Sequence, residues 1–134
     1  MRILVIDGQG GKIGKYIIEG IKASGIKADI TAVGTNSAST SAMLKAGADR
    51  GATGENSVVV CSKKCDVIVG PIGIVVADSL LGEVTAEMAV AVGRSPAKKL
   101  LIPINQCDNF IVGVSDLSMA MLIKSVVDEL IRMQ

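Results

Sequence analysis

The stretch that decides the fold is RILVIDGQGGKIG, residues 2–14. Its first half, Arg2 to Asp7, is a short run of β-branched residues that predicts a buried strand, and it stops at a cluster of glycines. A helical pattern follows from Gly11 to Ser24, because isoleucines recur there every four residues on one face. A strand, a glycine-rich turn and a helix in that order open the repeating unit of doubly wound α/β proteins.

The rest of the chain continues this alternation. We expect strands at Ala28–Gly34, Asp49–Ala52, Asp66–Gly70, Lys99–Ile104 and Phe110–Val114, and helices from Ser37 or Ser39 to Gly47, from Thr85 to Gly93, and from Ser115 or Asp116 onward. Isoleucine and valine total 32 against 9 leucines, a bias that favours buried parallel strands. The sequence therefore predicts a single α/β domain over residues 1–134. We expect a three-layer, Rossmann-like, doubly wound and mainly parallel sheet of about six strands in the order 3-2-1-4-5-6, with a ligand crevice between strands one and four.

Residues 57–64 leave two structures open. Their valine-rich start has strand propensity, but only four residues separate Cys61 from the strand at Asp66–Gly70. A parallel crossover needs about a dozen residues. The two runs therefore form an antiparallel hairpin, or the first of them is a helix. We favour the helix, with Asn56 as its cap, because it leaves Asp49–Ala52 as the third strand.

The composition excludes several classes of function. The net charge is +1, so no broad positive field attracts nucleic acid or anionic lipid. One tyrosine and one phenylalanine are too few for base stacking, and the absence of histidine removes the most common general base and zinc ligand. No apolar run reaches the roughly 20 residues that span a bilayer. We expect a cytoplasmic protein with no nucleic-acid or membrane partner.

The glycine-rich turn after the first strand is the strongest functional signal. At that position free backbone amides and the positive end of a helix attract a phosphate. Its spacing, G-x-G-G-x-x-G, departs from the dinucleotide fingerprint, and Tyr16 after Lys15 excludes a Walker A loop. We predict that the turn holds the phosphate of a nucleotide or of another phosphorylated small molecule; the alternative is that the glycines only let helix and strand pack closely. The residues concerned are Gly8, Gln9, Gly10, Gly11, Lys12, Ile13 and Gly14.

Further loops follow other strands at the same edge of the sheet. Thr35 and Asn36 follow the second strand, where an acid normally binds the ribose of NAD, and the missing acid weakens NAD as the ligand. NAD(P) or another nucleotide is the expected class of cofactor. The ligand-binding candidates at these loops are Thr35, Asn36, Gly70, Pro71, Ile72 and Gly73, and weaker candidates lie at Arg50 with Thr53–Asn56 and at Asn105, Gln106 and Asp108.

Catalytic groups are scarce, and we assign no catalytic residue and no metal site. Asp7 has two readings: it caps the turn, or it repels a pyrophosphate or holds a ribose, a metal ion or a water molecule. Asp78 and Glu83 are expected to be solvated. Cys61 and Cys65 are expected to be small buried apolar residues, with a metal or redox pair as the alternative.

Four segments resemble a family of small bacterial proteins of about this length that is known as a domain of unknown function. They are VIDGQGGKIG at 5–14, GTNSAST at 34–40, SAMLKAGADRGATGEN at 41–56 and DVIVGPIGIVVADSLLGE at 66–83. The resemblance covers essentially the whole chain, implies a soluble bacterial protein and supplies no catalytic residue. The first segment also resembles the glycine-rich turn of Rossmann dinucleotide-binding proteins.

These observations predict a nucleotide-binding or regulatory module that carries out no reaction of its own and forms a homo-oligomer. The small size favours it, since dehydrogenases usually add a substrate domain. One alternative is a small enzyme that acts on a nucleotide or a phosphorylated substrate, with a site completed across a dimer. The other is a structural interaction protein without a ligand.

Overall fold

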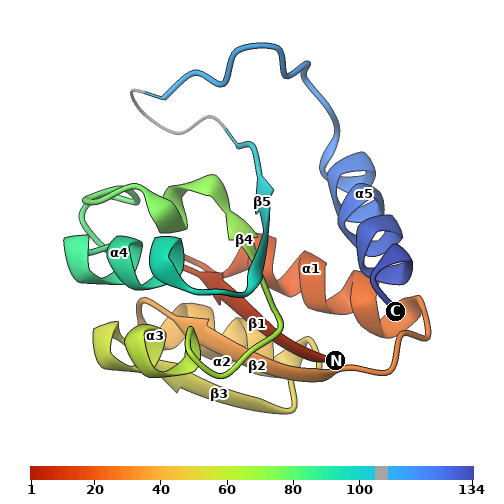
Figure 1. Ribbon diagram of the computed structural model, residues 1–134, viewed down its shortest axis with the longest axis horizontal. Coiled ribbons are helices and arrows are strands. Elements are labelled where there is room, and N and C mark those ends of the chain that lie inside the picture. Colours follow the sequence, from red (N-terminus) through yellow and green to blue (C-terminus); the bar gives the residue numbers. More distant parts are fainter. Residues whose placement is uncertain (105–108) are drawn as a thin grey trace.

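The chain folds into a five-stranded parallel sheet between two layers of helices, described for residues 1–104 and 109–134 of the computed structural model (Figure 1). In chain order the elements are β1 Arg2–Asp7, α1 Lys12–Ala23, β2 Asp29–Gly34, α2 Ser37–Lys45, β3 Arg50–Thr53, α3 Glu55–Cys61, β4 Val67–Pro71, the 3-10 helix η1 Ile72–Val75, α4 Ala86–Arg94, β5 Lys98–Ile102 and α5 Met119–Arg132. The strand order is β3-β2-β1-β4-β5, and every pairing is parallel. This confirms the predicted Rossmann-like, doubly wound class.

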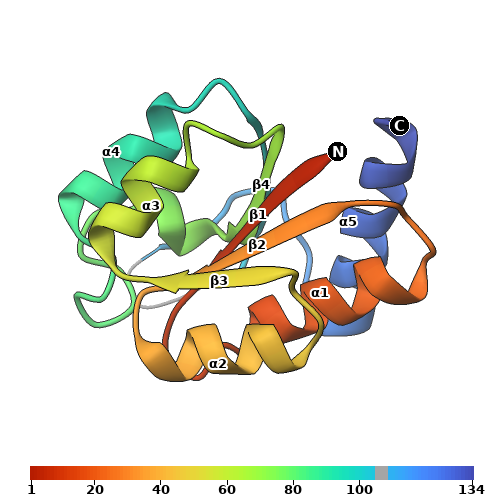
Figure 2. The same cartoon turned by 90° about the horizontal axis from the view of Figure 1, so that it is seen from below.

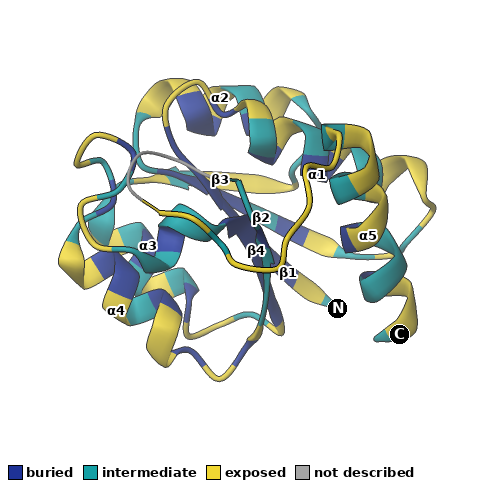
Figure 3. Ribbon diagram, turned by 90° about the horizontal axis from the view of Figure 1, so that it is seen from above, coloured by how far each residue is buried: buried dark blue, intermediate teal, exposed yellow. Residues whose placement is uncertain are grey.

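Alternating side chains of the strands build one core on each face of the sheet. In β1, Ile3 and Val5 pack with α1, α2 and α5, whereas Leu4 and Ile6 pack with α3 and α4. Figure 2 shows these two groups of helices on opposite sides of the strands. In Figure 3 the strands at the centre are buried and the outer faces of the helices are exposed. Both faces are covered, which explains why the central strands β1 and β4 are almost uninterrupted apolar runs.

Residues 57–64 begin in a helix, as the crossover length requires. β3 pairs with β2, with Arg50 opposite Thr31. The following helix, α3, packs on the same face of the sheet as α4 and connects β3 to β4. Residues 58–60 are valines, which favour strands, so the topology has overridden the local propensity. Gly54, not Asn56, lies at the N-cap of α3.

The sixth strand expected at Phe110–Val114 is wrong. These residues form no strand, and Phe110 and Val112 are 77% and 86% exposed. Only residues 103–109 lie between β5 and Phe110, too few for a parallel crossover. The polar loop expected at Asn105–Asp108 lies outside the described residues.

The N-cap residues of the helices agree only partly with those expected from the sequence. Thr85 caps α4 as expected, by accepting a hydrogen bond from the amide of Met88. Asn36 caps α2 in place of Ser37 or Ser39, and Ser118 caps α5 in place of Ser115 or Asp116. None of the helices in the described residues combines the length and the apolarity that crossing a bilayer requires.

Candidate functional site

The glycine-rich turn lies where the strand order reverses. β1 pairs with β2 on one side and with β4 on the other, and successive elements run outward in both directions from this point (Figure 2). Ligands of open α/β sheets bind beyond the carboxyl ends of the strands at such a switch point. The parallel strands bring the turn after β1, Thr35 and Asn36 after β2, and Gly70 and Pro71 of β4 to this one edge.

Asp7 occupies part of the turn in which the sequence placed a phosphate. Its side chain is inside the protein, with the residue 3% exposed. Oδ1 accepts a hydrogen bond from the amide of Gly8 at 2.8 Å, and Oδ2 accepts one from the amide of Gly14 at 2.7 Å. Burial raises the pKa of Asp7, against the amides of Gly14, Gly8 and Ile13, which lower it. Of the roles considered for Asp7, capping the turn is the one that this geometry shows.

Three of the glycines in the turn have reasons within the chain itself. A Cβ added at Gly8 would meet Oγ1 of Thr35 at 2.6 Å and Cδ1 of Leu80 at 2.8 Å, closer than real Cβ atoms approach. Gly11 has a φ of 75° at the N-cap of α1. A Cβ at Gly14 would clash with a methionine of α2. The packing alternative therefore accounts for these three positions.

Gly10 is different. It is exposed, its φ lies outside the left-handed region, and no atom lies within 4 Å of where its Cβ would be. Among the residues that the structure describes, the amides of Gly10 and Lys12 donate to no protein acceptor. The first turn of α1 also contains no acidic residue. The part of the turn that remains open to a ligand is therefore Gly10 to Lys12.

Glu83 is the residue that sequence reasoning missed. Its Oε1 accepts hydrogen bonds from the amide of Gln9 at 2.9 Å, from Oγ1 of Thr35 at 2.7 Å and from Nδ2 of Asn36 at 2.6 Å. Partial burial acts to raise the pKa of Glu83, but these donors outweigh it and the pKa is lowered. A charged acid therefore does lie beside the end of β2; Glu83 is half-buried, and the expectation of a solvated residue missed the three hydrogen bonds that hold it there. No local pattern marks it, because it comes from 48 residues beyond Thr35.

Residues 76–84, named here the covering loop, lie across the switch point. Leu80 is 4% exposed and lies against Gly8, and Glu83 follows it onto the turn. The backbone of the covering loop is left-handed at Asp78, Leu80, Leu81 and Gly82, with φ between 55° and 88°. Side chains of the loop therefore fill the crevice between β1 and β4, and a ligand in this conformation would lie on the outer side of the turn.

The candidates after β4 lie beneath this covering. A Cβ at Gly70 would come within 3.0 Å of the carbonyl oxygen of Ile6 in the neighbouring strand, so this glycine serves the close approach of β1 and β4. Pro71 is buried at the end of β4, while Ile72 and Gly73 begin η1. A Cβ at Gly73 would lie 3.1 Å from a serine hydroxyl of the covering loop. Gly70 therefore serves the packing of the strands, and Gly73 allows the covering loop to approach η1.

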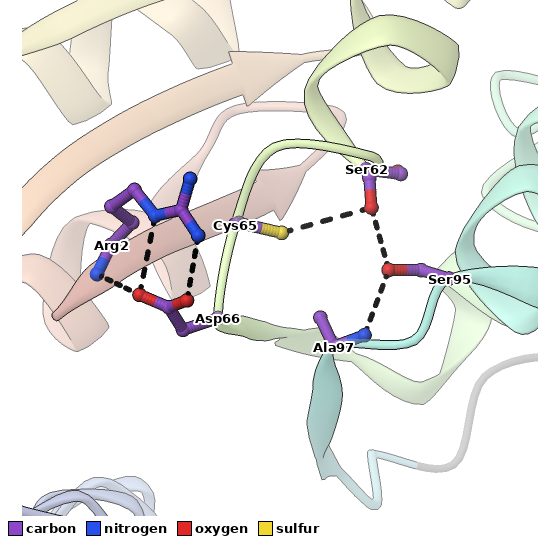
Figure 4. Close-up of polar contacts among 6 residues, drawn as sticks. All are labelled: Arg2, Ser62, Cys65, Asp66, Ser95 and Ala97. Carbon is purple, nitrogen blue, oxygen red and sulfur yellow. Dashed lines mark hydrogen bonds and ion pairs between the residues drawn. The ribbon is translucent and has the colours of Figure 1, made fainter.

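The two described cysteines lie away from this edge, near the start of the strands. Figure 4 shows that Sγ of Cys65 donates to the carbonyl oxygen of Ser62 at 3.9 Å. The same carbonyl oxygen accepts a hydrogen bond from Oγ of Ser95 at 2.6 Å. Ser95 in turn accepts from the amide of Ala97 at 3.1 Å. Burial raises the pKa of the Cys65 thiol, which makes it a poor nucleophile. No group of three or more His, Cys, Asp or Glu residues in the described part of the chain could hold a metal ion.

Arginines at this opposite edge are paired and far from the turn. The guanidinium of Arg2 lies 2.9 Å from Asp66 and holds the pKa of that carboxyl at about 2 (Figure 4). Arg50 pairs in the same way with Asp29 at 2.9 Å. The positive side chains nearest to the turn in sequence are Lys12 and Lys15, whose ammonium groups both lie 5.9 Å from the ring centre of Tyr16.

The comparisons with known proteins give a family and similarity to solved structures. The family model described as Domain of unknown function (DUF3842) matches residues 2–134. No curated protein matches the sequence. A similar solved structure is that of the dodecameric FMN-dependent UbiX-like decarboxylase from Escherichia coli O157:H7, with 14% sequence identity and a TM-score of 0.48 over 96% of this chain and 75% of that chain.

Proposed function

We propose that this chain, which belongs to the family described as Domain of unknown function (DUF3842), is a binding module for a nucleotide. The phosphate would lie on the amides of Gly10 and Lys12, and a ribose hydroxyl would donate to Glu83. The site would thus use the switch-point edge without entering the crevice that Leu80 fills. Whether the nucleotide is NAD(P) or another one depends on groups beyond the ribose and the phosphate.

The observation that carries the proposal is Gly10. Nothing in the described chain requires a glycine there, since its Cβ direction is open and its φ is not left-handed. Its exposed amide stands beside the N-terminus of α1, where an anion is stabilised by unpaired N–H groups and by the helix dipole. Lys12 also carries a positive charge; its ammonium group lies 5.9 Å from the ring centre of Tyr16, and a bound phosphate would draw it towards the turn. A phosphate that approaches the backbone supplies a physical reason for the missing side chain.

Glu83 supports the nucleoside part. Three donors hold Oε1 of Glu83 in place. No donor in the described part of the chain binds Oε2, so this oxygen can accept a hydrogen bond from a ligand. The lowered pKa keeps the carboxylate ionised at neutral pH. It lies beside Thr35 and Asn36, the place at which Rossmann proteins present an acid to ribose. The missing acid after β2 is therefore no argument against a nucleotide.

Replacing Gly10 with valine should abolish nucleotide binding and leave the fold intact. The branched side chain would cover the amides of residues 10–12, while no protein atom within 4 Å opposes it. We expect one nucleotide from a panel of AMP, NAD, NADP and FMN to raise the melting temperature of the wild-type protein, by a free energy of about 2.7 kcal/mol at a hundredfold excess over its Kd. The variant should melt like the wild type without ligand and show no such rise. A rise that survives in the variant would show that the turn is not the site.

Replacing Glu83 with glutamine should weaken the binding of the ribose without weakening the binding of the phosphate. The amide oxygen can still accept from Gln9, Thr35 and Asn36, but an NH2 group then takes the place of Oε2, and it cannot accept a hydrogen bond from a ribose hydroxyl. We expect the Kd of the nucleotide, measured by calorimetry, to rise about tenfold, which corresponds to about 1.4 kcal/mol. The Kd of inorganic phosphate should not rise. Glu87→Gln on the exposed face of α4 is the matched control; an unchanged nucleotide Kd in the Glu83 variant would leave Glu83 a structural role only.

A structural interaction protein is the second candidate. The observation that favours it is the filled crevice, because Leu80, Glu83 and Asp7 use the space and the amides that a ligand takes in other doubly wound proteins. Such a protein should show no thermal shift with any member of the nucleotide panel. An enzyme, in contrast, should convert the nucleotide that stabilises it, which chromatography of the incubated ligand would detect.

A further inference from the structure

β5 leaves one edge of the sheet without a neighbour. It is the last strand in the order β3-β2-β1-β4-β5, and in the described residues it pairs with β4 alone. Exposed strand edges present unpaired N–H and C=O groups that accept another strand, and lysines commonly guard them. The two lysines of β5 are both engaged within the chain, Lys98 with Glu129 at 2.6 Å and Lys99 with the carbonyl of Ser95. The edge is therefore open to a further strand.

An apolar groove runs along this edge. A cavity of about 280 Å³ lies between β5 and α5 and is lined by Leu100, Ile102, Pro103, Leu122 and Val126, among others. A second cavity of about 340 Å³ adjoins the first at Pro103 and Leu122, but Phe110, Ile111 and Val114 form part of its wall, so only the first cavity is a groove for a segment from another copy. A groove of this shape suits an extended segment with apolar side chains.

The chain itself contains such a segment, FIVGV at residues 110–114. Phe110, Val112 and Val114 are 77%, 86% and 40% exposed, although aromatic and β-branched residues favour strands. The segment belongs to the 103–118 connection between β5 and α5, and Figure 1 shows its described part standing away from the body of the molecule. The described residues of this connection, 103–104 and 109–118, lie in no helix or strand, and long connections in compact domains often carry a function.

We propose that residues 110–114 of a second copy of this chain bind along β5 as the sixth strand, and that the exchange is reciprocal in a two-fold dimer. The chain cannot supply that strand to itself in parallel, because residues 103–109 are too short for the crossover. Each copy carries a free edge at β5 and a strand-forming segment at residues 110–114, and a two-fold axis satisfies both in both copies. Main-chain hydrogen bonds to β5 would give the affinity, and the apolar groove would take alternate side chains of the segment.

The test is the mass of the protein in solution, measured by light scattering during size-exclusion chromatography. We expect twice the 13.8 kDa of one chain for the wild type. Val112→Pro removes an amide donor and should give a monomer, as should Phe110→Asp, while Val90→Asp, at another exposed valine of 46% exposure, should stay a dimer. Circular dichroism should show all three variants folded, since the substituted side chains are exposed.

Three results would overturn the proposal. A wild-type monomer at a concentration of about 100 µM, well above the Kd of a stable dimer, would show that no exchange occurs. A dimer that persists in Val112→Pro and Phe110→Asp would place the interface elsewhere. Hydrogen exchange distinguishes pairing within one chain, because amides 110–114 protected in a monomer would show an antiparallel hairpin with the chain's own β5, which also contradicts the proposal.

Discussion

Replacing Gly70 with alanine should destabilise the protein by about 3 kcal/mol, although it adds a single methyl group. The residue is buried in β4, and its Cβ would come within 3.0 Å of the backbone oxygen of Ile6 in β1. Backbone cannot rotate away as a flexible side chain can, so β1 and β4 must separate at the centre of the sheet. A Cβ there would also lie 3.0 Å from Cδ1 of Ile74, which is itself buried. Urea denaturation of both proteins measures the difference.

Gly10→Ala is the matched control for this prediction. Gly10 is in the same edge region, but its Cβ direction is open and its φ is not left-handed. We expect its free energy of unfolding to change by less than about 0.5 kcal/mol, the usual range for surface substitutions. If Gly70→Ala were as harmless as Gly10→Ala, the close contact of β1 and β4 would be wrong.

The fold was largely predictable because its signals are local or topological. The β-branched runs locate β1, β2 and β4, and the crossover length decided that residues 57–61 are helical despite their valines. The same length rule, applied to residues 103–109, excludes the parallel sixth strand that local propensity suggested at Phe110–Val114. Strand propensity alone predicts the wrong structure for residues 57–61 and for residues 110–114. It takes no account of the number of residues that a crossover connection between parallel strands needs.

The sequence predicts where the candidate site lies, but not which of its residues are available to a ligand. The glycine pattern correctly places a turn between β1 and α1 at the switch point, but it cannot tell which amides remain available. That depends on Asp7, which folds back onto Gly8 and Gly14, and on Glu83, which arrives from a distant loop. Neither contact follows from spacing along the sequence, because both depend on how side chains meet after the sheet has formed. The structure thus narrows the candidate phosphate-binding residues from the seven at Gly8–Gly14 to Gly10–Lys12.

Replacing Asp7 with alanine should cost about 2–4 kcal/mol of stability. The substitution leaves the buried amides of Gly8 and Gly14 without acceptors, and at a pH at which Asp7 is ionised it also removes a negative charge from the N-terminus of α1. The relief of a buried charge offsets part of this loss, since burial is what raises the pKa of Asp7. Chemical denaturation at pH 4 should show the loss, and Asp116→Ala, at an exposed aspartate whose φ is not left-handed, provides a comparison at which no buried amide is lost.

The pH dependence of this difference tests which effect dominates at Asp7. Because its folded pKa is raised above the unfolded value, the folded state binds the proton more tightly, and the contribution of Asp7 is greatest below the unfolded pKa. It declines as the pH rises through the folded pKa, so the difference between wild type and Asp7→Ala should shrink from pH 4 towards neutrality. A difference that grows over this range would mean that the amides and the dipole of α1 outweigh burial. Asp7 would then act as a fully charged internal anion, and a phosphate would have to bind beside a negative charge that never leaves the turn.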